Sequence, residues 1–248
     1  EHIFISHLHG DHFFGLPGLI STFRLLGRIK PLNIYGPVGL KKAITLLLKL
    51  GNSWTNYDLK FIELESEKSV KLIKNKKFSV YTIPLNHRVY TNGFLFKEFK
   101  KESKLLVDKV LKFKIDKTQF RGIKLGKDGL TPNGKIIVNR DLTEPKPDDV
   151  IYAYCSDTCF YPDIIDLIKK CDVLYHESTF LDLHKELAEK TKHSTAKQAA
   201  EIAKQAQVNK LILGHFSRRY KKINDFKSEA LQLFNNVELA SDGKVFNF

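Results

Sequence analysis

Six consecutive residues near the start of the chain, His7 to His12, read His-Leu-His-Gly-Asp-His and follow a short apolar run. In an extended segment alternate side chains point the same way, so His7, His9 and Asp11 could converge while His12 faces elsewhere. One short loop could therefore serve two neighbouring ions. Nitrogen and carboxylate ligands without a thiolate favour zinc, with manganese or iron as poorer fits. The alternative is a surface loop that is merely rich in histidine.

Further polar side chains of these kinds follow predicted strands later in the chain. Apolar or alternating runs predict strands at Phe78 to Ile83, Val150 to Tyr154, Val173 to Tyr175 and Leu211 to Leu213. The side chains after these strands are, in order, His87, Asp157, Glu177 and His215. Because open α/β sheets gather ligand-binding residues at the carboxyl ends of their strands, we expect one site there.

With these residues in place, the motifs resemble the ribonuclease Z family, the transfer RNA 3′-processing endonucleases of the metallo-β-lactamase superfamily. The first motif is common to the superfamily, whereas the later ones are similar to this family in particular. They are Leu-Asn-His at Leu85 to His87, Ser-Asp-Thr at Ser156 to Thr158, His-Glu-Ser-Thr at His176 to Thr179, His-Ser-Thr at His193 to Thr195, and Gly-His-Phe-Ser-Arg-Arg-Tyr at Gly214 to Tyr220. Together they span nearly the whole chain.

The resemblance implies a site with two zinc ions, with manganese as a possible substitute. One ion would be held by His7, His9 and His87, the other by Asp11, His12 and His215, and Asp157 would bridge both. Two ions about 3.5 to 4 Å apart can hold both sides of an in-line displacement at phosphorus. The expected reaction is removal of the 3′ trailer from a precursor transfer RNA, which leaves a 3′ hydroxyl.

Three residues have catalytic roles in this interpretation. His193 would give the leaving 3′ oxygen a proton, because an imidazole donates near neutral pH. Glu177 would orient or charge it, and Asp11 would orient or deprotonate the attacking water. A surface histidine beside a helix cap is the alternative for His193. His176 and His184 are left without a role, and His2 is expected to be structural.

The segment Lys97 to Lys146 differs from the rest of the chain. It holds fourteen Lys and Arg against seven Asp and Glu, a net charge of +7 out of +13 for the chain. Glu102 to Lys114 predicts a short basic amphipathic helix, and the glycines from Gly122 to Gly134 predict a flexible run. A solvated insertion with no role is the alternative.

In the resemblance this segment corresponds to the flexible arm that grips the transfer RNA elbow, reaching over the other subunit of a homodimer. The family's arm often carries a Gly-Pro motif, which is missing around Lys117 to Phe120. The expected partners are therefore precursor transfer RNA and a second copy of the chain. Residues expected to contact RNA are Arg218, Arg219, Lys109, Lys112, Arg121 and Lys124.

The pattern of elements predicts a βαβ rhythm. Helices are expected at Leu19 to Leu26, Val38 to Leu50, Asp163 to Cys171, and from Ser194 or Thr195 to Gln207. A strand is expected at Leu32 to Tyr35, and Phe61 to Leu64 with Val70 to Ile73 should form a meander. The resemblance implies an α/β metallo-β-lactamase fold, an αββα sandwich of two mixed sheets. Residues 1–96 and 147–248 would form it around the arm, 97–146, with N-terminal strands lying outside this chain.

Composition limits the class of protein. The longest apolar runs carry Lys or Arg within a few positions, which excludes a membrane span. The three cysteines, Cys155, Cys159 and Cys171, indicate free thiols in a reducing cytoplasm, and the first two are expected to fill the core.

Two other functions remain open. A cyclic-nucleotide phosphodiesterase or an arylsulfatase-like hydrolase could use the same metal site, but would not need the basic segment. A non-catalytic RNA-binding module could keep zinc for structure, but structural zinc sites are usually cysteine-rich.

Overall fold

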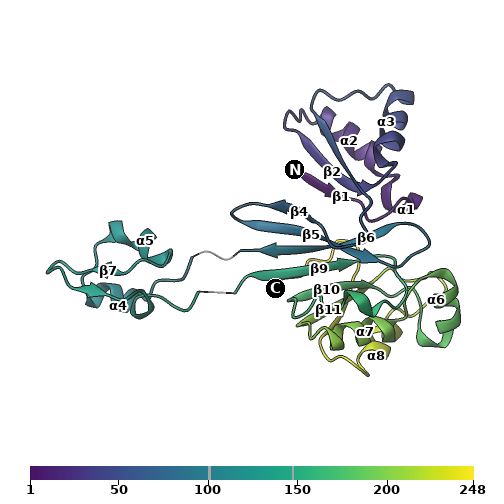
Figure 1. Ribbon diagram of the computed structural model, residues 1–248. Helices are drawn as coiled ribbons and strands as arrows, with labels where there is room; N and C mark the ends of the chain where they lie inside the picture. Colours follow the sequence, from purple (N-terminus) through teal and green to yellow (C-terminus); the bar gives the residue numbers. More distant parts are fainter. Residues whose placement is uncertain (100–101, 147) are drawn as a thin grey trace. The chain divides into compact units, whose positions relative to one another are not determined.

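The computed structural model describes residues 1–99, 102–146 and 148–248 (Figure 1). These form two compact units. Unit 1 comprises Glu1–Ile73, Val80–Phe96 and Ile151–Phe248, and unit 2 comprises Lys74–Ser79 and Lys97–Val150. Among the described residues, no helix combines the length and apolar character needed to cross a membrane.

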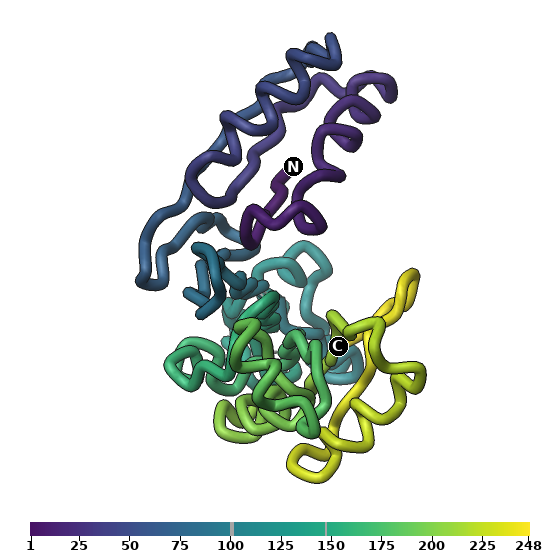
Figure 2. Tube along the Cα trace, turned by 90° about the vertical axis from the view of Figure 1, so that its right-hand side faces the viewer, coloured from purple at the N-terminus to yellow at the C-terminus, as the bar shows by residue number. Residues whose placement is uncertain are grey.

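Unit 1 begins with a three-stranded sheet. Its order is β1 (His2–Phe4), β2 (Leu32–Pro37) and β3 (Leu59–Leu64), and both pairings are parallel. The crossovers run through α2 (Leu16–Leu25) and α3 (Leu40–Leu50), which lie side by side (Figure 2). Leu40, Ile44 and Leu48 recur every four residues, so one face of α3 is buried against the sheet. The helices and the strand β2 predicted here are confirmed.

The second sheet has seven strands. Its order is β12 (Val237–Leu239), β11 (Lys210–Gly214), β10 (Val173–Glu177), β9 (Val150–Cys155), β6 (Thr91–Glu98), β5 (Phe78–Leu85) and β4 (Lys71–Lys74). The four strands from β9 to β12 pair in parallel. Phe4 of β1 packs on Phe94 and Phe96 of β6, which links the two sheets.

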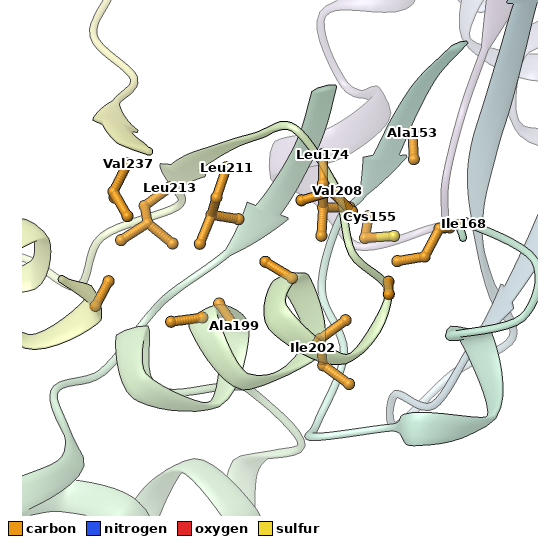
Figure 3. Packing of buried hydrophobic residues seen from close by; sticks show 14 of the residues in the cluster. Ala153, Cys155, Ile168, Leu174, Ala199, Ile202, Val208, Leu211, Leu213 and Val237 are labelled. Atoms are coloured by element: carbon orange, nitrogen blue, oxygen red, sulfur yellow. The ribbon is translucent and has the colours of Figure 1, made fainter. Parts of the chain in front are cut away.

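Helices cover the parallel half of this sheet. The helices that contact its strands are α7 (Ala196–Gln205) and α8 (Asn224–Ala230), and α6 (Lys185–Thr191) precedes α7 in the chain. Ala199 and Ile202 of α7 pack with Leu174 and Leu211 of the strands in a fully buried cluster (Figure 3). Thr195 caps α7, since its hydroxyl accepts from Gln198 N–H while the Gln198 side chain accepts from the Thr195 N–H. The helix predicted to start there is confirmed.

Two predicted features are wrong. Asp163 to Cys171 is not an α-helix: a 3₁₀ turn, Pro162–Ile164, is followed by further turns. The Lys170 N–H donates to the Ala206 carbonyl instead of back into its own segment, so tertiary bonding replaces the helical ladder. The two strands of the predicted meander lie in different sheets, β3 beside β2 and β4 beside β5.

Unit 2 is a small packed body. Its elements are α4 (Val107–Lys112), a 3₁₀ turn (Lys117–Gln119), α5 (Phe120–Lys124), β7 (Gly129–Leu130), β8 (Ile136–Ile137) and a second 3₁₀ turn (Asn139–Asp141). Val110, Ile115, Ile123, Ile137 and Leu142 form its buried core.

The predicted basic helix of unit 2 is shorter than expected, and the glycines from Gly122 to Gly134 lie in α5, in β7 and in turns or bends. Gly129 is buried, and a Cβ there would lie 2.5 Å from Leu142 Cδ1, so this glycine permits close packing. The αββα layering and the N-terminal strands that the resemblance implies stay predictions.

Candidate metal centre

The backbone conformation changes in the middle of the histidine motif. The side chains before and after that point therefore face in different directions. After β1 the chain is extended through His9, and α1 (Gly10–Phe13) then begins. Because the helix turns its residues away, Asp11 does not point with His7 and His9 as an extended segment would require. It lies beside His12, with Asp11 Oδ2 3.5 Å from His12 Nε2. The motif still supplies side chains to two groups. His7 and His9 belong to the first group, and Asp11 and His12 belong to the second.

The first group comprises His7, His9, His87 and Asp157, whose ligand atoms lie within 4.8 Å of one another. His9 Nδ1 is 3.1 Å from His7 Nε2 and 3.4 Å from His87 Nε2. Asp157 Oδ2 is 3.6 Å from His7 Nε2 and 3.9 Å from His87 Nε2. In a tetrahedral zinc site with bonds near 2.0 Å, ligand atoms are about 3.3 Å apart, so this spacing fits a divalent ion.

The second group of side chains lies beside Oδ1, the other carboxylate oxygen of Asp157. His12 Nε2 and His215 Nε2 are each 3.5 Å from Asp157 Oδ1. Asp11 completes this group, with its ligand atom within 4.8 Å of those of both histidines. The two oxygens of Asp157 thus face the two groups of side chains.

Hydrogen bonds on the far nitrogens orient these imidazoles. His87 Nδ1–H donates to the Lys192 carbonyl at 2.8 Å, and Ser6 Oγ lies 3.0 Å from His7 Nδ1. Such bonds fix the tautomer that leaves Nε2 free as a ligand. Burial and the nearby His12 lower the pKa of His7 to about 3, which keeps that ring neutral.

Asp157 is held as an anion. Burial alone would raise the pKa of its carboxyl group, but the hydrogen bond from His12 and the charges of His215 and His12 lower it strongly. Imidazole nitrogens around a buried carboxylate are a donor set that suits divalent metal ions. The residues present therefore fit a metal centre.

Glu177 and His193 form a pair beside these groups. Glu177 is fully buried, and its Oε1 lies 2.7 Å from His193 Nδ1. Backbone N–H groups of Thr158 and Thr179 also donate to this carboxylate. Burial alone would lower the pKa of His193, but the hydrogen bond to Glu177 and its charge raise it overall. Because His193 Nδ1 bonds Glu177, Nε2 is the ring nitrogen that remains available for proton transfer.

His215 adopts an unusual backbone conformation. Its φ is +59°, in the left-handed region, which costs on the order of 1 kcal/mol for a residue with a side chain. Thr179 Oγ1 lies 2.7 Å from His215 Nδ1 and so helps to hold the ring. No role was predicted from the sequence for Thr179, Ser6 or Thr158, although the motifs His-Glu-Ser-Thr and Ser-Asp-Thr contain two of them.

The residues expected to contact RNA are mostly exposed. Arg218 and Arg219 lie exposed in the loop after β11, downstream of His215. In unit 2, α4 carries Lys109 and Lys112 and α5 carries Arg121 and Lys124. Only Lys124 among these is half-buried, and it lines a cavity of about 440 Å³ in unit 2 with Arg140 and Lys146. No carboxylate in the described part of the chain forms an ion pair with these four side chains of unit 2.

The remaining histidines and the cysteines lie outside the two groups. His2 is on β1, near the Tyr35 hydroxyl, and His184 bonds the Tyr220 hydroxyl. His176 is buried in β10. All three cysteines are free thiols; Cys155 fills the core as expected, whereas Cys159 is half-exposed in a loop.

The chain is similar to known proteins along nearly its whole length. The chain is 42% identical over 243 residues to a ribonuclease Z from Parabacteroides distasonis, a match that covers 98% of this chain and 80% of the relative. Its structure resembles the short form of human tRNase Z, with a TM-score of 0.66 and 27% identity, over 99% of this chain and 78% of that one.

A second solved structure has a similar fold. The metallo-β-lactamase fold protein YhfI from Bacillus subtilis matches with a TM-score of 0.64 and 18% identity, over 99% of this chain and 77% of that one. No family model matches the chain.

Proposed function

The chain belongs to the ribonuclease Z family, the endoribonucleases that process the 3′ end of transfer RNA, and we propose that its two groups of ligands hold two zinc ions at which a precursor is cut. His7, His9 and His87 would hold one ion, Asp11, His12 and His215 the other, with Asp157 shared. The observation that carries the proposal is that the two oxygens of Asp157 face separate histidine groups at 3.5 to 3.9 Å. When bound, two such ions would supply positive charge that stabilises the displacement at phosphorus and would acidify the attacking water.

Two residues of the chain would handle the protons. Asp11 is the most exposed member of its group, with 71% of its side chain accessible, so it can reach the water that attacks phosphorus. His193 would give its Nε2 proton to the leaving 3′ oxygen, and Glu177 would keep the ring charged and oriented through Nδ1. The products would be a transfer RNA with a 3′ hydroxyl and a trailer with a 5′ phosphate.

The RNA would be gripped mainly by cationic side chains. Exposed Lys109, Lys112 and Arg121 of unit 2, with Lys124 beside them, offer a sequence-independent contact to phosphates. Arg218 and Arg219, in the loop that follows His215, would clamp phosphates, since a guanidinium binds a phosphate through two hydrogen bonds.

A small-molecule phosphodiesterase of the same fold would not need these cations, which is why the RNA substrate is favoured. A second copy of the chain, as the resemblance implies, and action in the cytoplasm, which three free cysteines suit, belong to the same proposal.

The proposal is tested by incubating the protein with a 3′-extended precursor transfer RNA in the presence of zinc or manganese. We expect a shortened transfer RNA ending in a 3′ hydroxyl, and loss of this product when a chelator removes the metal. Hydrolysis of small phosphodiesters together with an uncut precursor would favour the small-molecule phosphodiesterase. Sedimentation of the same sample would show whether the chain is a dimer.

A further inference from the structure

Thr179 lies where the catalytic pair and the metal ligands meet. It lies two residues after the end of β10 and is 7% exposed. Its hydroxyl oxygen lies 2.7 Å from Glu177 Oε2 and 2.7 Å from His215 Nδ1, with His193 Nδ1 more distant at 3.2 Å. One small side chain therefore touches the carboxylate of the pair and a ligand of the second metal group.

The donors and acceptors allow one assignment of protons. The Glu177 carboxylate only accepts, so the Thr179 hydroxyl must donate its proton to Oε2. The same hydroxyl can then only accept from His215, which places a proton on His215 Nδ1. In the neutral ring, His215 Nε2 then has its lone pair free, and this atom faces Asp157 Oδ1. His193 gives its Nδ1 proton to the other oxygen of Glu177.

We propose that Thr179 is a positioning residue that fixes His215 as an Nε2 metal ligand and ties it, through Glu177, to His193. The inference rests on the proposed function, because it gives His215 its role at the second metal. Thr179 would act through His215 and would not touch the substrate. The left-handed backbone of His215 strengthens the case, because a ligand in a strained conformation needs outside contacts to hold its ring.

A purely structural role for Thr179 is the competing explanation. Its backbone N–H also donates to Glu177 Oε2, at 2.9 Å, so the hydroxyl could merely reinforce a local turn. In that case losing the hydroxyl would lower the stability of the loop and affect both metals alike. A positioning role affects mainly the metal that His215 holds.

Two variants of Thr179 separate these explanations. Thr179→Val keeps the shape but removes the hydroxyl, whereas Thr179→Ser keeps the hydroxyl. Thr82→Val is the matched control, since Thr82 is 2% exposed in β5 and its hydroxyl bonds the Val70 N–H, away from both metal groups.

The measurement is zinc binding to the whole protein, by competition with a chromogenic chelator and without RNA. In Thr179→Val we expect one of two zinc ions to bind about 10- to 100-fold more weakly, with the other unchanged, and Thr179→Ser to restore it. Nitrogen-15 spectra of the zinc-free protein should show His215 protonated at Nδ1 in the parent and a mixture of tautomers in Thr179→Val.

Unchanged affinity for both ions in Thr179→Val would overturn the inference and leave the proposed function standing. Equal weakening of both ions, or the same effect in Thr82→Val, would also overturn it in favour of the structural role. A parent protein that binds no zinc would remove the proposed two-metal site and the inference with it.

Discussion

His193 Nδ1 lies 2.7 Å from Oε1 of the fully buried Glu177. These residues are sixteen positions apart in the sequence, where Glu177 precedes α6 and His193 follows it. The buried carboxylate fixes which nitrogen of the ring carries a proton toward it, and so which one is presented to the site.

Replacing His193 by alanine should lower kcat for precursor cleavage by about 10²- to 10⁴-fold with little change in KM, since a general acid acts in the transition state. Glu177→Gln should behave similarly, and the double variant should be little worse than either single one. Single-turnover kinetics at saturating enzyme would measure this. His184→Ala, a half-buried histidine bonded to Tyr220, is the control and should keep full activity. Full activity in His193→Ala would rule out its role as the acid.

Asp157→Ala should weaken both bound metal ions, because the two oxygens of this carboxylate face the two histidine groups. Metal content after dialysis against a weak chelator, determined by mass spectrometry, is the measurement. Asp163→Ala removes an exposed carboxylate outside both groups and should keep the parent's metal content. Retention of two tightly bound ions in Asp157→Ala would exclude the bridging position.

Removing the four cations of unit 2 should flatten the salt dependence of RNA binding. With Lys109, Lys112, Arg121 and Lys124 changed to alanine, each lost phosphate contact should reduce the slope of log K against log salt by about 1. Filter binding of precursor transfer RNA at several salt concentrations measures it. The control changes four cations of unit 1, Lys41, Lys42, Lys49 and Lys60, to alanine. An equal loss of slope in both variants would mean that only net charge matters.

Ile123→Ala should separate RNA processing from the chemistry of the metal centre. Ile123 is fully buried in the core of unit 2, so its truncation should cost about 2 to 5 kcal/mol of that unit's stability. We expect precursor cleavage to fall while hydrolysis of bis-p-nitrophenyl phosphate, a small diester, is unchanged. Both rates would be measured on the same preparation. A parallel loss of the two activities would show that unit 2 is needed for the catalytic domain itself.

The sequence by itself predicted which side chains form the candidate site. Residues able to bind a metal are recognisable from their type, and the parallel strands that end just before Asp157, at Glu177 and just before His215 were predicted from short apolar runs. Local signals also determined the start of α7, because a capping box depends on residues only three positions apart.

Only the tertiary structure decided at which residue the histidine motif divides between the two groups and which side chains hold the imidazoles of the site by hydrogen bonds. Neither the division of the His7 to His12 motif between two groups nor the placing of Thr179 against His215 can be read from periodicity, since both depend on where α1 begins and how β10 and β11 align. The segment after Pro162 failed as a helix because a backbone hydrogen bond to Ala206, far along the chain, replaced a local one. Unit 2 was predicted from its charge, but its packed core depends on apolar side chains from separate short elements, which only the folded chain brings together.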